Sequence, residues 1–246
     1  MFVEKLFFKK LSNIALTDLT KINFIAGDGN YGKSLLLEEI YNGVLGHVNK
    51  NEVIYISKPR DITKELNRIF KNSDFIKEKL LRDNKLLNKF LSVLYRYFYK
   101  RKEEQVMVIS ENRIDRIFKD IKKSGITIQF IFCLMFSIDT YALVEQNVKK
   151  VILVDDMDNY LNYKQIKLFW EDIYKTEGTQ FFFVIRHMDV LNGFYKFSCE
   201  RKLQKTTNED TVSLLLLYKK KDSVLAARYN EESLMYNIEN NNDVLG

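Results

Sequence analysis

The segment from Gly27 to Ser34, Gly-Asp-Gly-Asn-Tyr-Gly-Lys-Ser, matches the phosphate-binding pattern G-x-x-x-x-G-K-[ST] at every fixed position. Gly27 and Gly32 let the backbone turn and approach a phosphate without a Cβ in the way. In such loops the lysine, here Lys33, reaches the β- and γ-phosphate oxygens, and the Ser34 hydroxyl can ligate Mg²⁺. The pattern therefore predicts a loop that binds the phosphates of a nucleoside triphosphate.

The sequence on either side of this loop supports the match. Residues 21–26 (KINFIA) are typical of a short buried strand that enters the loop, and residues 35–41 (LLLEEIY) of a helix that leaves it. A helix N-terminus here would place partial positive charge beside the phosphates. The alternative is a glycine-rich turn between a strand and a helix, which does not require this spacing. The predicted nucleotide contacts are Gly27, Asp28, Gly29, Asn30, Tyr31, Gly32, Lys33, Ser34 and Leu35.

A second motif, residues 151–156 (VILVDD), is a predicted buried strand that ends in two acidic residues. Carboxylates at the carboxyl end of such a strand lie at the edge where α/β sheets bind ligands. We expect Asp155 to hold Mg²⁺ opposite Ser34, mostly through water, and Asp156 to be the general base that polarises the attacking water. Two acids that only begin a loop are the alternative, which a phosphate loop about 120 residues upstream makes weaker.

The next apolar run, residues 181–185, is followed by Arg186 and His187. A histidine at this place can contact a γ-phosphate and report its presence, and a purely structural histidine is the alternative. Uncharged strands that alternate with helices form mostly parallel sheets covered on both faces. We therefore expect an α/β P-loop NTPase fold with a mostly parallel central sheet flanked by helices. Two short strands within residues 3–16 would add an N-terminal antiparallel β element.

From about residue 61 to residue 104 the sequence changes to an amphipathic helical pattern with many Lys and Arg. We expect two or three helices that form an insertion in a single domain spanning residues 1–246. Their cations could line a nucleic-acid backbone or a partner surface, and a solvated polar face on helices packed by their leucines is the alternative. The basic residues are Lys77, Lys79, Arg82, Lys85, Lys89, Arg96, Lys100, Arg101 and Lys102.

Composition limits the classes of protein that remain. Lys and Arg number 39 against 33 Asp and Glu, a net charge of +6 that permits contact with nucleic acid without proving it. No stretch approaches ~18 uncharged apolar residues, so we expect no membrane span, and the first residues lack a signal-peptide pattern. Cys133 and Cys199 are too few for a disulfide framework and lie outside any metal-ligand spacing. We therefore expect a reducing, cytoplasmic location.

In their order along the chain, these motifs resemble the ABC-type AAA ATPases of the RecF/SMC/OLD-like branch. The resemblance is closest to the small AAA-domain ATP-binding proteins of bacteria, archaea and their viruses. Residues 8–41 match that family's opening strands, phosphate loop and first helix. Residues 151–163 resemble its Walker B strand and following loop, and residues 182–187 fall where it carries a strand ending in a switch histidine. Residues 224–229 and 234–240 resemble a stretch near its C-terminus.

The resemblance implies that the nucleotide is ATP with Mg²⁺, and that two ATP molecules are sandwiched between two protomers. In that family each site is completed by a signature loop from the opposite subunit. By position, Lys123-Ser124-Gly125 would be this loop, with Ser124 and Gly125 facing the partner's γ-phosphate. A Ser-Gly before a helix is otherwise an ordinary N-cap.

Some positions depart from the family pattern. Asp156 stands where the family has its catalytic Glu, and a base misplaced by ~1 Å can lose on the order of a hundredfold in rate. The signature loop is reduced, and Tyr160 and Asn162 replace a Gly and a His that usually follow the Walker B strand. We therefore expect secure ATP binding and inefficient hydrolysis.

Two functions fit these residues. The first is a slow Mg-dependent ATPase that dimerises head-to-tail when ATP is bound, with Lys33, Asp156 and His187 as catalytic residues; the resemblance implies a role in DNA maintenance, mobile elements or defence. The second is a nucleotide-gated interaction module with negligible hydrolysis. A transporter ATPase subunit is disfavoured because neither a full signature nor a glutamine loop is recognisable, and a kinase because no acceptor-binding lid is.

Overall fold

The structure is a computed structural model, and it divides the chain into two compact units. Met1–Ser57 and Lys149–Gly246 form an α/β unit, and Lys58–Val148 form a helical unit. The residues described are 3, 6–7, 15–27, 32–46, 48, 52–71, 73–99, 110–144, 150–161, 163–176, 178–202, 211–220, 223–240 and 242.

The α/β unit is built on one six-stranded sheet. Its strands are β3 (Ile22–Gly27), β4 (Val53–Ile56), β5 (Lys150–Val154), β6 (Thr179–Val184), β7 (Val212–Lys220) and β8 (Ser223–Asn230). Their order across the sheet is β4-β5-β6-β3-β7-β8. All neighbours run parallel except β7 and β8, which form an antiparallel hairpin at one edge. The predicted mostly parallel sheet is therefore confirmed.

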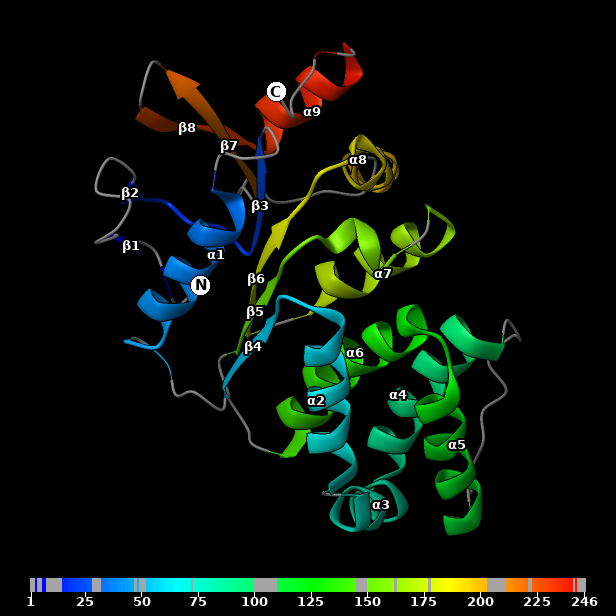
Figure 1. Ribbon diagram of the computed structural model, residues 1–246. Coiled ribbons are helices and arrows are strands. Elements are labelled where there is room, and N and C mark those ends of the chain that lie inside the picture. The colour runs from blue at the N-terminus through cyan, green and yellow to red at the C-terminus, as the bar shows by residue number, and fades with distance from the viewer. Residues whose placement is uncertain are drawn as a thin grey trace. The chain divides into compact units, whose positions relative to one another are not determined.

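Helices cover both faces of this sheet (Figure 1). They are α1 (Lys33–Val44), α7 (Tyr163–Lys175) and α8 (Met188–Lys202), with α9 (Glu231–Glu239) packed beside β7 and β8. Side chains alternate along a strand, so neighbouring residues serve opposite faces. Ile25 and Phe182 belong to the buried cluster that includes the α1 residues Leu36 and Ile40. These apolar strands are buried on both faces, which is why they read as continuous runs in the sequence.

The face opposite α1 is dominated by aromatic rings. Phe24 of β3 makes edge-to-face contacts with Trp170 of α7, at 5.3 Å between centroids, and with Phe194 of α8, at 5.7 Å. Trp170 also contacts Phe183 of β6 at 5.8 Å. Each such pair contributes about 0.5–1.5 kcal/mol beyond the area that it buries. This cluster packs α7 and α8 against β3 and β6.

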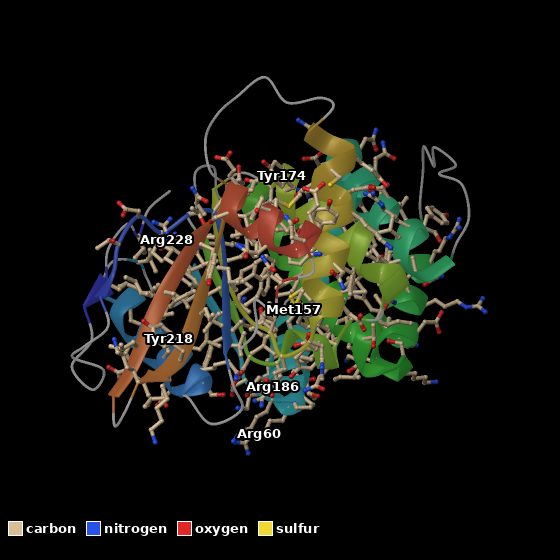
Figure 2. The ribbon with its side chains drawn as sticks, turned by 90° about the horizontal axis from the view of Figure 1, so that it is seen from above. Arg60, Met157, Tyr174, Arg186, Tyr218 and Arg228 are labelled. Atoms are coloured by element: carbon tan, nitrogen blue, oxygen red, sulfur yellow. The ribbon has the colours of Figure 1, made fainter. Side chains whose placement is uncertain are left out.

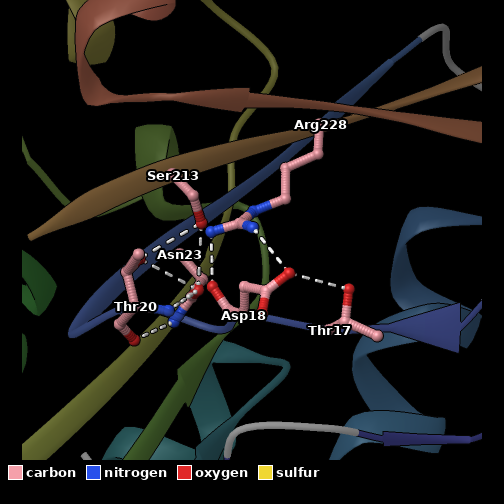
Figure 3. A network of polar contacts seen from close by, with 6 residues as sticks. All are labelled: Thr17, Asp18, Thr20, Asn23, Ser213 and Arg228. Carbon is pink, nitrogen blue, oxygen red and sulfur yellow. Dashed lines mark hydrogen bonds and ion pairs between the residues drawn. The ribbon is translucent and has the colours of Figure 1, made fainter. Parts of the chain in front are cut away.

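A buried asparagine joins β3 to its neighbours (Figure 3). The Asn23 carbonyl oxygen accepts from the Thr20 backbone N–H at 2.9 Å and from the Ser213 hydroxyl at 3.1 Å. Its amide nitrogen donates to the Thr20 carbonyl at 2.7 Å and to the Phe181 carbonyl at 3.1 Å. Nearby, the Arg228 guanidinium of β8 pairs with Asp18 at 3.5 Å. The network ties the turn before β3 to β6, β7 and β8.

The two ends of the α/β unit differ in how well the sequence predicts them. The expected N-terminal antiparallel element is present as a short pair, β1 (Leu6–Phe7) and β2 (Ala15–Leu16). Sequence analysis assigned no secondary structure after β8, but α9 forms there. Asn230 caps it by accepting from the Ser233 backbone N–H at 2.9 Å, and its apolar residues are buried at helical spacing.

The helical unit contains the range of the predicted insertion and continues beyond it. Its elements are α2 (Pro59–Lys71), α3 (Ser73–Arg82), α4 (Asn84–Leu94), a π-helical turn (Tyr95–Tyr99), α5 (Glu111–Lys123) and α6 (Ile126–Val144). Pro59 occupies the first position of α2, where a missing N–H costs nothing. The Asp83 carboxylate caps α4 by accepting from two backbone N–H groups, at 2.9 and 3.1 Å. Residues 100–104 of the predicted insertion lie outside the described residues.

Phenylalanines form the core of this unit. Phe132 of α6 lies 6.2 Å from Phe70 of α2, 6.3 Å from Phe90 of α4 and 6.4 Å from Phe118 of α5, measured between ring centroids. The apolar α6 is therefore the element around which α2, α4 and α5 pack. Within the described part of the chain, no helix is both long and apolar enough to cross a membrane.

Candidate functional site

The carboxyl ends of β5, β6 and β3 meet at one edge of the sheet, because these strands are parallel neighbours. Gly27 ends β3, Asp155 and Asp156 follow β5, and Arg186 and His187 follow β6 shortly after its last residue. Ligands of α/β sheets bind at such an edge. The strand order thus brings together residues from three distant parts of the sequence.

Gly27 is required by the sheet as well as by the loop. Its φ is +132°, and a Cβ built on it would lie 2.2 Å from the backbone oxygen of Leu217 in β7. Gly32 also has a positive φ, +79°, but the nearest atom to its Cβ position is Leu35 Cβ, at 4.0 Å. Backbone conformation alone therefore favours glycine at 32. The predicted contacts between these two glycines lie outside the described residues: Asp28, Gly29, Asn30 and Tyr31.

Helix α1 begins directly after Gly32, whose carbonyl accepts the Leu36 N–H at 2.8 Å. Lys33, Ser34 and Leu35 therefore form the first turn, where backbone N–H groups lack intrahelical acceptors and favour an anion. The Lys33 side chain is buried, 3% exposed, and its ammonium donates to the Gly27 carbonyl. This contact holds the amine at the base of the predicted phosphate loop, while Ser34 and Leu35 are exposed.

Asp155 and Ser34 interact directly through a side-chain hydrogen bond. Asp155 is 6% exposed, and its backbone N–H donates to the Ile56 carbonyl of β4 at 2.8 Å. Its Oδ1 atom is buried and has no hydrogen-bond partner among the residues that the structure describes. A buried carboxylate oxygen beside a serine hydroxyl supplies the hard oxygen ligands that Mg²⁺ prefers.

Burial raises the pKa of the Asp155 carboxyl above its ordinary value. The hydrogen bond from Ser34 opposes this shift, and the negative charge of Asp156 adds to it. The charged form of Asp155 is therefore costly when no cation is near. A bound divalent cation would remove that cost.

Asp156 is held by Arg186, a residue to which sequence analysis assigned no role. The Arg186 Nε–H donates to Asp156 Oδ1, and the two side chains form an ion pair. This hydrogen bond raises the pKa of the Arg186 guanidinium. Asp156 itself has a left-handed backbone, with φ 50° and ψ 54°. Asp tolerates this conformation better than most residues, yet it costs of order 1 kcal/mol or more.

Asp158 fixes the segment that carries Arg186 and His187. Its two carboxylate oxygens accept the backbone N–H of Arg186 at 2.7 Å and that of His187 at 3.2 Å. Burial raises the pKa of the Asp158 carboxyl, and these two N–H groups counteract the shift. The loop after β5 and the loop after β6 are thereby joined at both backbone and side-chain level. In the sequence, Arg186 stood out only as the neighbour of His187, a predicted site residue, and nothing there indicated its contacts with Asp156 and Asp158.

The predicted signature residues form the turn between α5 and α6 in the helical unit. The Ser124 hydroxyl donates to the Ile121 carbonyl at 2.6 Å, and the Gly125 carbonyl accepts from Ile128 and Gln129 N–H groups. The Gln129 side chain donates to the Ser124 carbonyl at 3.0 Å. The Ser124 hydroxyl therefore bonds to the last turn of α5, which differs from the N-cap alternative. Nothing in these contacts requires a nucleotide.

Some basic residues of the predicted insertion are engaged with acids of their own unit. Lys77 is largely buried and pairs with Asp74 at 2.9 Å and with Asp115 at 3.0 Å. Hydrogen bonds to these two carboxylates raise the pKa of the Lys77 ammonium. Arg82 pairs with Glu78 at 2.8 Å, one helical turn away. The charges of Lys77 and Arg82 are therefore balanced by acidic residues of the same unit.

No protein-family model matches the sequence, and no curated protein matches it either. The fold is similar to a solved Smc head bound to the C-winged helix domain of ScpA, with a TM-score of 0.57 and 11% identity. That match covers 96% of this chain and 100% of the other. An SMC head domain from Thermotoga maritima matches with a TM-score of 0.48 and 10% identity, covering 93% and 99% of the two chains. The mixed α/β fold is therefore similar to that of the ScpA-bound Smc head.

Proposed function

We propose that this chain binds ATP with Mg²⁺ at the carboxyl edge of β3, β5 and β6, and that it hydrolyses ATP slowly. The hydrogen bond between Ser34 and Asp155 carries this proposal. These residues belong to two motifs that lie far apart in the sequence, and a magnesium nucleotide site needs them together. The Smc-head fold supports the proposal as the architecture in which the two motifs meet.

The residues present fit a magnesium ion. Asp155 offers a buried carboxylate oxygen that has no partner within the described part of the chain, and Ser34 lies beside it. When bound, Mg²⁺ would neutralise charge on the β- and γ-phosphate oxygens. Lys33 and the N–H groups of the first turn of α1 would bind the remaining phosphate oxygens. In this arrangement Asp155 stays charged, because the cation offsets the cost of its burial.

Catalysis would rest on Asp156 and His187 in addition to these groups. Asp156 would orient the attacking water, and His187 would contact the γ-phosphate. Two features account for slow turnover. An Asp reaches less far than a Glu, and the Asp156 carboxylate is already paired with Arg186. The guanidinium occupies Oδ1, which leaves the other carboxylate oxygen of Asp156 to accept a hydrogen bond from water.

Equilibrium binding and steady-state hydrolysis test this proposal. Wild-type protein should bind a fluorescent ATP analogue in a Mg²⁺-dependent manner, and Lys33→Ala should abolish both binding and turnover. Asp155→Ala should remove the Mg²⁺ dependence of binding. If Lys33→Ala still binds and hydrolyses ATP, and Asp155→Ala still binds it in a Mg²⁺-dependent manner, the proposal is wrong. A parallel titration with GTP would establish base preference.

We further propose that ATP drives head-to-tail dimerisation, with Ser124 and Gly125 of one protomer facing the γ-phosphate of its partner. The resemblance to ABC-type ATPases is the basis of this proposal. Light scattering should show a doubling of mass with ATP in Asp156→Asn, a variant in which hydrolysis is blocked. Gly125→Arg should prevent the doubling and leave nucleotide binding intact. An unchanged mass with saturating ATP would exclude this part of the proposal.

The Arg186–Asp156 ion pair favours a second candidate, a nucleotide-gated interaction module with negligible hydrolysis. In that case ATP would hold a conformation that a partner recognises. Tight binding of ATP without measurable turnover would support this candidate. Asp156→Glu separates the slow ATPase from the interaction module. A large gain in turnover in this variant would mean that Asp156 suppresses hydrolysis in the native site.

A further inference from the structure

Arg186 lies at the surface of the α/β unit (Figure 2), in the segment that follows β6 at the carboxyl edge of the sheet. Its side chain is 41% exposed, and that of its ion-pair partner Asp156 is 29% exposed. The Asp155 carboxylate also acts on the Arg186 guanidinium electrostatically. Since Asp155 is hydrogen-bonded to Ser34, the guanidinium lies within electrostatic range of the proposed magnesium site.

The backbone of Arg186 is anchored independently of its side chain. Asp158 holds the N–H groups of Arg186 and His187, and neither bond involves the guanidinium. A change of side-chain rotamer would therefore leave this loop in place. The guanidinium can exchange one acceptor for another without disturbing the ends of β5 and β6.

We propose that Arg186 detects the third phosphate of the bound nucleotide. In the resting state its guanidinium pairs with Asp156; with a triphosphate bound, it exchanges Asp156 for an oxygen of the γ-phosphate. The exchange releases the Asp156 carboxylate, which can then turn towards the attacking water. This inference rests on the proposed function and adds a residue that distinguishes ATP from ADP.

The chemistry of the two acceptors favours the exchange. A guanidinium donates two parallel hydrogen bonds to a phosphate, and a terminal phosphate carries more charge than a carboxylate. The exchange leaves Asp156 without the guanidinium, but its side chain is 29% exposed, so water can solvate the released carboxylate. ADP offers no γ-phosphate, so the ion pair persists and the base stays engaged.

Affinities for ADP and for a non-hydrolysable ATP analogue, both measured with Mg²⁺ by calorimetry, test this inference without relying on turnover. Arg186→Gln should lower the affinity for the ATP analogue by about tenfold to a hundredfold, as expected for the loss of one charge-assisted hydrogen bond. The affinity of this variant for ADP should change by no more than about twofold. Arg186→Lys should recover part of the difference, because an ammonium binds phosphate as a point charge.

A second background separates direct contact from an effect through Asp156. Asp156→Asn frees the guanidinium and should strengthen binding of the ATP analogue. In this background Arg186→Gln should still lower the affinity for the ATP analogue by at least about tenfold. If Arg186→Gln has no effect there, Arg186 acts only by neutralising Asp156, and the inference is wrong.

Arg68→Gln is the matched control, because Arg68 forms a comparable pair with Glu65 at 2.5 Å within α2 of the helical unit. It should leave both affinities unchanged. If Arg186→Gln lowers the affinities for ADP and for the ATP analogue equally, the inference is wrong, while the proposed nucleotide site stands. Absence of binding by the wild-type chain would instead overturn the proposed function itself.

Discussion

At the level of single residues, Gly27 is constrained by two parts of the molecule at once. It begins the predicted phosphate loop, and its Cα also lies against the backbone of β7. The phosphate-loop pattern accounts for this glycine by close approach to a phosphate. The structure adds a reason that is independent of any ligand, because β3 and β7 could not pair as they do with a side chain here.

Gly27→Ala should therefore destabilise the α/β unit by about 2–4 kcal/mol, the combined cost of a steric clash and an unfavourable φ. Gly32→Ala is the control, since it has a positive φ without the clash, and should cost only about 1 kcal/mol. Urea unfolding followed by the fluorescence of Trp170, the single tryptophan of the chain, measures both. Similar losses in the two variants would contradict this account.

The buried charge of Asp155 is expected to lower the stability of the fold when no Mg²⁺ is bound. Its raised pKa means that the charged form destabilises the fold at any pH above that folded-state pKa. Without nucleotide and Mg²⁺, Asp155→Asn should be more stable than wild type at pH 8 by about 1 kcal/mol.

The sign of the pH dependence follows from the same shift. As pH falls through the folded-state pKa towards the ordinary value of 3.8, wild-type Asp155 takes up a proton and loses its penalty. The advantage of Asp155→Asn should therefore shrink with falling pH. Urea unfolding of both proteins at several pH values checks this, and an advantage that grows on acidification would contradict it.

At the level of elements, β3 is held by polar contacts as well as by apolar burial. Asn23 is 3% exposed and joins the turn before β3 to β6 and β7. The sequence shows this position only as a polar residue within an apolar strand. It indicates neither the partner Ser213, which lies 190 residues away, nor the reason for an amide.

Asn23→Ala should destabilise the α/β unit by about 2–4 kcal/mol, because it leaves several buried groups without partners. Ser213→Ala removes one of these hydrogen bonds and should cost about 1 kcal/mol. Urea unfolding of both variants, again read by Trp170, provides the comparison. Equal losses would show that the amide is not the centre of the network.

The strands and helices that the sequence predicted well are those with a strong local signal. Residues 151–154 and 181–184 are uninterrupted apolar runs, and the structure places β5 and β6 there. The helix α9 was missed because its segment is rich in Asn and Glu, and its burial depends on β7 and β8. Local propensity is a weak guide where tertiary contacts supply the stability.

For the whole molecule, the proposed site predicts coupling between nucleotide and stability. A ligand that binds only the folded state at a concentration of 100 times its Kd stabilises by about 2.7 kcal/mol. Mg²⁺ and the non-hydrolysable ATP analogue should therefore shift the urea transition of wild-type protein to higher concentration. Lys33→Ala should unfold at the same urea concentration with and without them; an equal shift in this variant would place the nucleotide elsewhere.

The phosphate-loop pattern, the acidic pair after an apolar strand and the class of the sheet could be recognised from sequence, because each depends on local spacing or periodicity. The contacts of Gly27 with Leu217, Asn23 with Ser213 and Asp156 with Arg186 could not. Each joins residues far apart in the chain, and their proximity follows from the order in which the strands assemble. Strand order is set by packing over the entire sheet. The pairing of Arg186 with Asp156, the proposed base, follows from the position of β5 beside β6, which only the tertiary structure shows.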